Sequence, residues 1–266
     1  MAITGSGTQA DPWVVTTYAE LVEKANDEGY IKIGNNINII DEYPDGDMPT
    51  LEIVNSNIDG DGKVISNWYK TNSGNCVTVS GSSQVTDLHF CNIYDLSGEF
   101  CVLNGYNEDY HFVNCKFNGR VASAFMIAID DGRSSRNFKS CSFYIDSRSS
   151  YGAFVSNVYS YIGIKDCYLK VISSSAPSVF GSSASTSIEN CYIESNIPCG
   201  AYGYISNSVL DITSTETFTA GNSGNDLSII NSTHAPNMTA GTGFAAVDDT
   251  HWLDVSYLQG IGFNIA

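Results

Sequence analysis

The sequence has few positively charged residues. Its 266 residues include 12 Lys and Arg against 29 Asp and Glu, so the formal net charge is −17. Such an excess of negative charge repels nucleic acid and anionic lipid, because both carry negative charge themselves. We therefore expect neither a nucleic acid nor a membrane among the partners of this protein.

Long apolar stretches are missing as well. No run approaches the ~20 apolar residues that a membrane-spanning helix needs, and the opening segment Met1–Ser6 lacks the basic and apolar regions of a signal peptide. These two absences predict synthesis and folding in a cytoplasm.

Motifs for metals, phosphates and triad catalysis are also absent. The eight cysteines form neither CxxC pairs nor a Cys-His spacing typical of zinc sites. Neither a Ser-His-Asp order nor a phosphate-binding glycine-rich motif stands out. The sequence therefore predicts no metal, no cofactor and no catalytic residue.

What the sequence does contain is a repeat. A six-residue phrase returns along the chain: apolar, any, Asn/Ser/Asp, Cys/Ser, any, apolar. Clear copies open at Phe112, Phe138, Ile164 and Ile188, and looser copies open at Ile53, Leu88, Ile205 and Ile229. The middle copies open at residues 88, 112, 138, 164 and 188, so their steps are 24, 26, 26 and 24 residues. A fixed period of this length indicates a repeat architecture.

Each period is built from short strand-like segments. Apolar and β-branched runs are broken by Ser, Gly and Asn, with no helical stretch between them. A second phrase keeps the same step, since Cys76–Gly81 and Cys101–Gly105 open 25 residues apart and the run 125–129 follows at a similar distance. Two or three registered strands per period predict a single-stranded parallel β-helix, an all-β solenoid.

The phrase itself predicts a corner followed by an inward strand. Its fourth and sixth residues share one face of a strand, whereas its first residue does not fit that alternation, so a bend falls between them. The polar third residue tolerates the left-handed conformation that a bend requires. The predicted polar ladder contains Asn55, Asn114, Ser140, Asp166, Asn190, Asn207 and Asn231, and Phe90 interrupts it.

The fourth position of the phrase places cysteines inside the coil. Cys91, Cys115, Cys141, Cys167 and Cys191 occupy this position, and Ser56, Ser208 and Ser232 replace them in other copies. Stacked strands lie ~4.8 Å apart, but parallel side-chain directions suit a disulfide poorly. We predict buried free thiols.

The two ends depart from the repeat. We predict a short helix across residues 19–25, with Thr16 or Thr17 as its N-cap and Glu20 in a capping box, which covers the first turn of the coil. The predicted division is a cap with first strands over 1–50, helical turns over 51–234 and a C-terminal arm over 235–266, all in one structural domain. The apolar end carries Trp252, Leu253, Tyr257, Leu258 and Phe263, which form either a lid on the last turn or a docking segment.

Tyrosines are the main candidates for a binding surface. Tyr168 and Tyr192 occupy the same outward repeat position on successive turns, and Tyr144 lies near them in sequence. This face suits a protein interface or a site that stacks on sugar rings. The alternative is that tyrosine is here because it favours exposed strands.

Two groups of carboxylates are candidates for catalysis or calcium binding. Asp130 and Asp131 follow a strand, as does the paired aspartate of polygalacturonase-like hydrolases, but the Asn-Thr-Asp, Gly-His-Gly and Arg-Ile-Lys motifs of that family are missing. Asp59 and Asp61 flank glycines, a pattern typical of an ordinary turn.

Three segments resemble a known group of proteins. Gly5–Thr17, Tyr30–Ile39 and Ile58–Ile65 are similar to the openings of right-handed β-helix proteins of the pectate-lyase-like superfamily that tailed bacteriophages encode, and Tyr257–Phe263 is similar to short endings of such proteins. The resemblance implies a right-handed coil and a virion component, which is a capsid decoration protein, a head-fibre protein or a tail spike.

From these features we expect a non-enzymatic structural protein on the exterior of a phage particle. Capsid decoration is favoured over a tail spike, because depolymerising spikes generally add a head-binding segment and a catalytic groove to the coil. The alternatives are a tail-spike or receptor- or glycan-binding module and a small polysaccharide-degrading enzyme. The expected partners are other virion proteins, with a host surface glycan or a second copy of the chain as further options.

Overall fold

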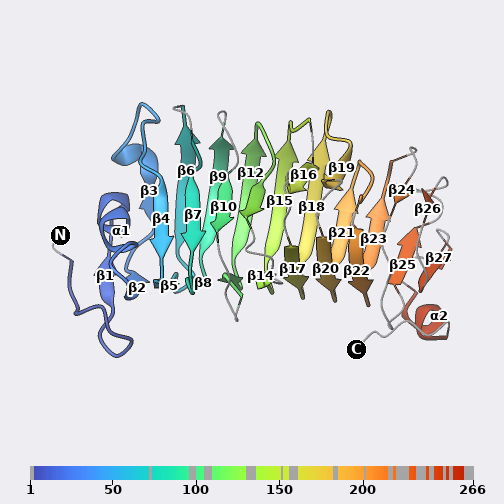
Figure 1. The fold of residues 1–266 in the computed structure, drawn as a ribbon, viewed down its shortest axis with the longest axis horizontal. Coiled ribbons are helices and arrows are strands. Elements are labelled where there is room, and N and C mark those ends of the chain that lie inside the picture. The colour runs from blue at the N-terminus through green and yellow to red at the C-terminus, as the bar shows by residue number, and fades with distance from the viewer. Residues whose placement is uncertain are drawn as a thin grey trace.

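The chain folds into an elongated coil of parallel strands. The computed structural model describes residues 3–71, 74–95, 100–104, 110–129, 136–150, 152–155, 161–181, 185–200, 202–214, 218–219, 228–231, 238–239, 243–247, 250–251 and 254–260. Successive turns lie side by side from the N-terminal end to the C-terminal end (Figure 1), and the named strands pair only in parallel within three long sheets. The predicted fold class, an all-β parallel β-helix, is confirmed.

The strands of the coil belong to three sheets, which have nine, ten and six strands among the described residues. Sheet 1 contains β1 (Trp13–Val15), β2 (Tyr30–Ile33), β5 (Asn57–Asp59), β8 (Gln84–Thr86), β11 (Phe112–Val113), β14 (Arg136–Lys139), β17 (Tyr161–Lys165), β20 (Ser185–Glu189) and β22 (Tyr202–Ser206). Sheet 2 contains β3 (Ile37–Asn38), β6 (Val64–Lys70), β9 (His89–Asp95), β12 (Lys116–Val121), β15 (Ser142–Ser147), β18 (Tyr168–Ser173), β21 (Tyr192–Ser195), β23 (Val209–Ile212), β25 (Ser228–Asn231) and β27 (Phe244–Val247). Sheet 3 contains β4 (Leu51–Val54), β7 (Val77–Ser80), β10 (Cys101–Asn104), β13 (Met126–Ile129), β16 (Gly152–Val155) and β19 (Ser178–Phe180).

A few elements lie outside these sheets. The helices are α1 (Tyr18–Lys24), the 3-10 helix η1 (Ile39–Asp41) and α2 (Val255–Gly260), and β24 (Phe218–Thr219) pairs with β26 (Met238–Thr239). The strand β27 pairs with β25 and so continues sheet 2 into residues that we expected to form an irregular arm.

The corner between sheets 1 and 2 is a ladder of left-handed residues. Asp61, Asp87, Asn114, Ser140, Asp166, Asn190 and Asn207 have φ between 46° and 56° there. Asn190 donates through Nδ2 to Oδ1 of Asp166 at 3.0 Å, and Asn114 makes the same bond to Asp87. Short polar side chains tolerate this backbone and join successive corners, which confirms the predicted role of the polar third position.

Two predicted members of the ladder lie elsewhere. Asn55 is also left-handed, with φ of 48°, but it follows β4 at the corner between sheets 3 and 1. Asn231 lies in β25, where it pairs with Val247. The phrase fits Asn55 because the corner between sheets 3 and 1 also takes a left-handed residue there, whereas at Asn231 the strand simply continues.

The copy that we placed at Leu88 begins instead at Val85. Val85 pairs with Phe112, so Asp87 occupies the corner and Leu88 takes the inward position of the cysteines. Cys91 pairs with Ser66 on sheet 2 and is only partly buried, which corrects its predicted place in the cysteine column. A copy that opens at Val85 and one that opens at Leu88 both place apolar residues at suitable intervals. Only the copy at Val85 puts an aspartate, Asp87, in the left-handed corner, whereas the copy at Leu88 would put Phe90 there.

The remaining cysteines form the expected inward column. Cys115, Cys141, Cys167 and Cys191 are buried, and Ser208 and Ser228 continue the column through bonds from the Cys191 amide (3.1 Å) and the Ser208 amide (3.3 Å). Ser228 thus takes the position that we predicted for Ser232, which lies outside the described residues. All eight cysteines are free, as predicted.

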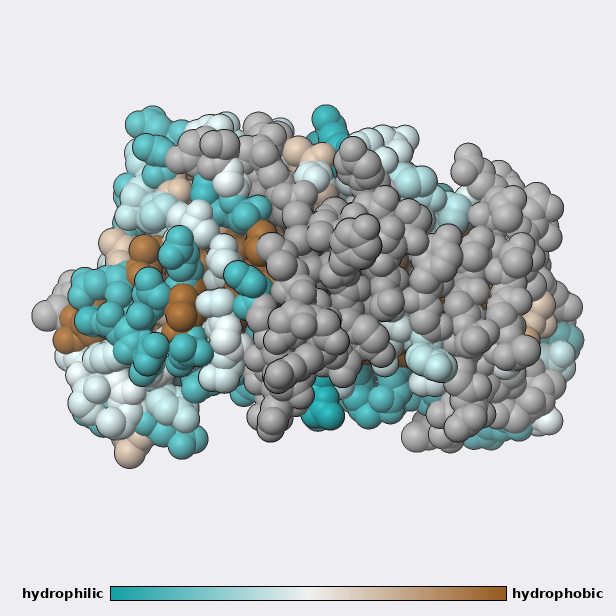
Figure 2. All heavy atoms as spheres, viewed as in Figure 1, coloured by the Kyte–Doolittle hydropathy of each residue, from teal (hydrophilic) through white to brown (hydrophobic). Residues whose placement is uncertain are grey.

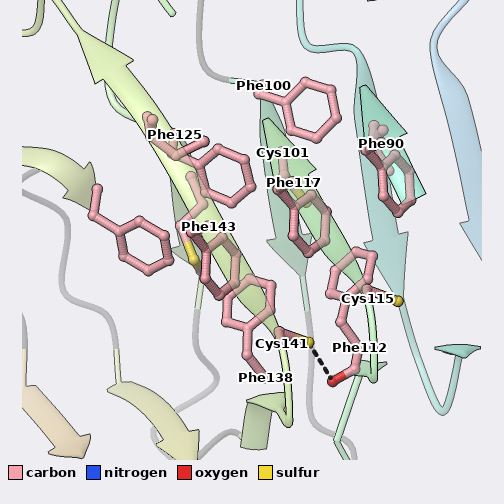
Figure 3. Close-up of a cluster of buried hydrophobic side chains, with 14 of the residues drawn as sticks. Phe90, Phe100, Cys101, Phe112, Cys115, Phe117, Phe125, Phe138, Cys141 and Phe143 are labelled. Atoms are coloured by element: carbon pink, nitrogen blue, oxygen red, sulfur yellow. Dashed lines mark hydrogen bonds between the residues drawn. The ribbon is translucent and has the colours of Figure 1, made fainter. Parts of the chain in front are cut away.

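Aromatic rings fill the centre of the coil. Phe117 stacks on Phe90 and Phe143 from sheet 2, with ring centroids 4.7 Å and 4.9 Å away. A second stack joins Phe112 to Phe138 at 5.3 Å (Figure 3), and Cys141 lies beside it with Sγ 3.5 Å from the carbonyl oxygen of Phe112. Burial of each such ring contributes about 1.5–3 kcal/mol, so this core fixes the stacking of the turns.

The helix α1 covers the N-terminal end of the coil (Figure 1). The hydroxyl oxygen of Thr17 accepts from the Glu20 amide at 3.2 Å, which makes Thr17 the N-cap. The Glu20 carboxylate returns to the amide of Thr16 at 2.7 Å rather than to that of Thr17. Tyr18 and Leu21 of this helix are fully buried. The predicted capping helix is therefore present, and it begins one residue earlier than expected.

Candidate functional site

The outer face of sheet 2 carries three rows of side chains, because the strands pair in register. The first row contains Lys116, Ser142, Tyr168 and Tyr192. The second row contains Asn118, Tyr144, Lys170 and Glu194. The third row contains Tyr69, Tyr94, Arg120, Asp146 and Ile172. These rows place the predicted tyrosines Tyr144, Tyr168 and Tyr192 on one face of the coil.

Tyr168 and Tyr192 are neighbours in the first row, and the hydroxyl group of each is bonded to a carboxylate. Their rings stack with centroids 5.6 Å apart, as their shared repeat position predicts. The Tyr168 hydroxyl donates to Glu194 at 2.8 Å, and the Tyr192 hydroxyl donates to Asp211 at 3.2 Å. Burial, with these carboxylates as the next cause, raises the pKa of both phenols, so both stay neutral donors.

Tyr144 lies in a different row from this pair. It pairs with Lys170, whose Nζ lies 5.8 Å from the centre of the Tyr144 ring. The Lys170 ammonium is held at 2.6 Å by Glu194, and it lowers the pKa of that carboxyl. The Tyr144 side chain is 49% exposed. The structure therefore separates Tyr144 from the other two predicted tyrosines.

Tyr144 borders a groove in the outer face. The groove has a volume of about 670 Å³, within the range of roughly 300–1,000 Å³ that is usual for small-molecule sites. Its lining comes from η1 and from β6, β9, β12, β15 and β18, and consists of Ile40, Asn67, Tyr69, Asn92, Ile93, Tyr94, Asn118, Gly119, Arg120, Tyr144, Asp146 and Ile172. We call this the sheet 2 groove.

Two bulges shape one side of the sheet 2 groove. Asn67 in β6 and Asn92 in β9 have φ of 62° and 53° and lie at the same place in their strands. At this place β9, and with it β6, has one residue more than β12. Asn92 donates through Nδ2 to Asn67 Oδ1 at 3.1 Å, and Asn67 donates in turn to Asn38 at 2.7 Å. A bulge redirects the residues that follow it, and here those residues include Tyr69 and Tyr94.

The bulged strands meet a regular strand at Gly119. The register shifts between β9 and β12 at this point, and Gly119 pairs with Ile93. A Cβ atom at residue 119 would lie 2.2 Å from the carbonyl oxygen of Ile93, so a larger residue cannot fit without moving the backbone. Glycine therefore permits the change of register that opens the groove between Tyr94 and Tyr144.

The aromatic and ionic side chains of the third row give the groove a mixed character. Tyr69 and Tyr94 stack with centroids 5.8 Å apart, and Tyr94 is 42% exposed. Arg120 pairs with Asp146 through two contacts of 2.6 Å and 2.7 Å to the same carboxylate oxygen. The site thus combines phenol rings, amides and an ion pair whose two charges offset each other.

Sequence analysis did not identify Tyr69 and Tyr94. Both follow the pattern Asn-any-Tyr, as Asn67-Trp68-Tyr69 and Asn92-Ile93-Tyr94, and these copies are 25 residues apart. That spacing equals one turn, so a second search for repeats outside the six-residue phrase would have found them.

The other candidates lie apart from this groove or outside the described residues. Asp130 and Asp131 are among the residues that the structure leaves undescribed, as are Trp252, Leu253, Phe263 and the side chain of Leu258. Asp61 contacts Lys32 at 3.3 Å and Lys63 at 3.5 Å, while the Asp59 carboxylate accepts from the Asp61 amide at 2.9 Å. These bonds explain the two aspartates as part of a turn.

The described part of the C-terminal segment exposes apolar side chains. Val255 and Tyr257 in α2 are 52% and 38% exposed, and Tyr257 stacks on His251 with ring centroids 4.1 Å apart. The described residues contain no cluster of three or more potential metal ligands among His, Cys, Asp and Glu. None of their helices has the length and hydropathy that crossing a bilayer requires.

Figure 2 shows one face of the molecule, on which apolar side chains of the N-terminal turns lie in small patches between hydrophilic ones. This agrees with a coil whose large apolar groups point inward. The coloured part of this face is mixed in hydropathy.

Comparisons with known proteins add little to this description. Neither the protein-family models nor the curated proteins contain a match to the sequence. Among solved structures, the coil is similar to a Bacteroides ovatus protein that bears the provisional name immunoglobulin A1 protease, with 13% identity and a TM-score of 0.48 over 92% of this chain and 86% of that one. A likeness at this level carries no argument about activity.

Proposed function

We propose that this chain is a non-enzymatic structural protein on the exterior of a tailed-phage particle, as a capsid decoration or head-fibre protein. The observation that carries the proposal is the aromatic core in the described turns of the coil. Rings from three sheets contact one another from Phe90 to Phe154, and the helix α1 covers the first turn. Such a core makes a stiff rod that holds its surface at a distance from an attachment point.

The resemblance to phage β-helix proteins supports the same assignment. It rests on Gly5–Thr17, Tyr30–Ile39 and Ile58–Ile65, which form the cap and the first turns. The charged side chains of sheet 2 support a structural role as well, because they pair across neighbouring strands. Lys170 with Glu194 and Arg120 with Asp146 are examples.

Attachment to the particle is assigned to the C-terminal end. Val255 and Tyr257 are exposed there, and exposed apolar side chains near an end favour contact with a partner. The partner is another virion protein. The alternative role of this end as a lid predicts that its removal destabilises the coil.

Locating the chain in purified particles tests the proposal. We expect peptides of the chain in washed particles and antibody labelling of intact particles, since the protein is on the exterior. Absence from the particle, with the protein found only in the surrounding lysate, would contradict the proposal.

A second experiment separates docking from a lid. Particles stripped of the chain are mixed with the full protein, with a variant lacking residues 252–266, or with Val255→Ser/Tyr257→Ser. Docking predicts that the deletion keeps the melting temperature and loses binding, with weaker binding by the double variant. A lid predicts lower solubility and a lower melting temperature, and unchanged binding by a stable deletion would exclude both roles.

A second candidate function is glycan binding, as in a receptor-binding or tail-spike module. The sheet 2 groove favours it, because exposed phenol rings beside amides are typical of surfaces that hold sugars. This function is compatible with the first, since an exterior rod can also contact the host surface.

A further inference from the structure

We propose that the sheet 2 groove binds a neutral oligosaccharide, with Tyr94 and Tyr144 as the residues that hold the sugar rings. The inference rests on the proposed function only for the source of the glycan, which is the host cell surface. The shape and the lining of the groove support the rest of the proposal.

The placement of the tyrosines suits a ligand with apolar faces and polar edges. Tyr94 in β9 and Tyr144 in β15 are two strands apart, with β12 between them, so their backbones are separated by about 10 Å. The intervening strand β12 places Asn118 beside Tyr144 and Arg120 beside Tyr94, and both residues line the groove. A pyranose ring offers C–H groups to an aromatic face and hydroxyl groups to its surroundings, so it matches this arrangement.

The remaining lining offers hydrogen bonds in both directions. The amide side chains of Asn92 and Asn118 each carry donors and an acceptor, and both residues are exposed. Sugar hydroxyls also act as donors and acceptors, which makes them suitable partners. A purely apolar ligand would displace water from these amides without replacing its hydrogen bonds. That loss makes the binding of an apolar ligand unfavourable.

The charges in the groove favour a neutral ligand. Arg120 is the cationic residue of the lining, and its guanidinium is already paired with Asp146 at 2.6 Å. An acidic sugar would have to displace that carboxylate in a protein with a net charge of −17. Both effects oppose the binding of an anion.

The length of the groove favours an oligosaccharide over a single sugar. Its lining runs across β6, β9, β12, β15 and β18, and four strand spacings span about 19 Å. Several sugar units in a row can therefore contact successive strands.

Direct titration tests this inference with defined sugars. The full-length protein is titrated with maltohexaose, cellohexaose and chitohexaose, followed by saturation-transfer NMR and calorimetry. Hexagalacturonate serves as the acidic comparison and N-acetylglucosamine as the single sugar. We expect at least one neutral hexamer to bind, more tightly than either comparison compound.

Two variants and a matched control locate the site. Tyr94→Ala and Tyr144→Ala should each weaken binding by about three- to tenfold, and the double variant should weaken it further. Tyr204→Ala is the control, because Tyr204 is 60% exposed but lies on sheet 1. Far-UV circular dichroism and melting temperatures establish that all variants are folded.

Several results would overturn the inference. Lack of binding to all three neutral hexamers would do so, as would tighter binding of hexagalacturonate or an equal loss in Tyr204→Ala. These outcomes are separate from the test of the proposed function, which depends on the presence of the chain in particles. A chain that is on the particle but binds no sugar refutes the inference alone, whereas a sugar-binding chain absent from particles refutes the virion role alone.

Discussion

The aromatic core makes a sharp prediction about Phe143. Its side chain is 1% exposed, and its ring stacks on Phe117 at 4.9 Å and meets Phe138 edge-on at 5.0 Å. Phe143→Ala removes a buried ring whose neighbours are fixed by the turns on either side, so the cavity cannot close easily. We expect a loss of about 3–5 kcal/mol in the free energy of unfolding, near the upper end of this range.

Cys141→Ser is the matched comparison from the same turn. Cys141 donates through Sγ to the carbonyl of Lys139 at 3.3 Å, and Ser208 makes the equivalent bond to Ser206 at 2.8 Å in a later turn. Because serine already fits this column, we expect a change below about 1.5 kcal/mol. Tyr144→Ala, on the outer face of the same strand, should change stability by less than about 1 kcal/mol.

Urea titrations followed by far-UV circular dichroism measure these differences. Repeat proteins can unfold in parts, so hydrogen exchange on the wild type and on Phe143→Ala shows whether the loss is local or spreads to neighbouring turns. If Phe143→Ala proved milder than Cys141→Ser, the inward register of β15 would be wrong.

Two further predictions concern the thiols and an exposed ion pair. Protein purified without reductant and then denatured should release most of its eight cysteines as free thiols in a colorimetric assay, because the cysteines are free and those of the column are buried; three or four disulfides found by mass mapping would contradict this. The lowered pKa of Glu194, caused first by its bond to Lys170, means that its contribution to stability is complete above the ordinary glutamate pKa of ~4.3 and is lost as pH falls through the lower folded value. At pH 7 the free energy of unfolding of Glu194→Gln should therefore be lower than that of the wild type by at most about 1 kcal/mol. The free energies of the two proteins should become equal at acidic pH, whereas a difference that does not change with pH would exclude a role for the charge.

The regular part of the fold was predictable from the sequence because one local requirement repeats. A left-handed corner needs Asn, Asp or Ser, and the residue after it points inward, so Asn114-Cys115, Ser140-Cys141, Asp166-Cys167 and Asn190-Cys191 reveal the register by themselves. The prediction of the capping helix succeeded for a similar reason, since Thr17 and Glu20 form a local hydrogen-bonded motif.

The errors arose where the local signal has two solutions. Ile53 and Ile229 open sequences that satisfy the phrase, yet Asn55 serves the corner between sheets 3 and 1 and Asn231 lies within a strand. The turn lengths also change near the C-terminal end, because Cys191 and Ser208 are only 17 residues apart in the column. A period taken from the middle of the chain cannot anticipate such shortening.

The candidate site illustrates what a single repeat cannot indicate. Tyr168 and Tyr192 share a repeat position, and for that reason they stack on each other and bond to Glu194 and Asp211. Where turns stack regularly, outward side chains bond to neighbours on the next turn. A groove forms where this regular stacking is interrupted. The break here combines the bulges at Asn67 and Asn92 with the register change at Gly119, next to the groove that Tyr94 and Tyr144 line. The proposed binding site therefore lies on turns where the six-residue phrase is least regular, and variants there should alter stability less than variants in the aromatic core.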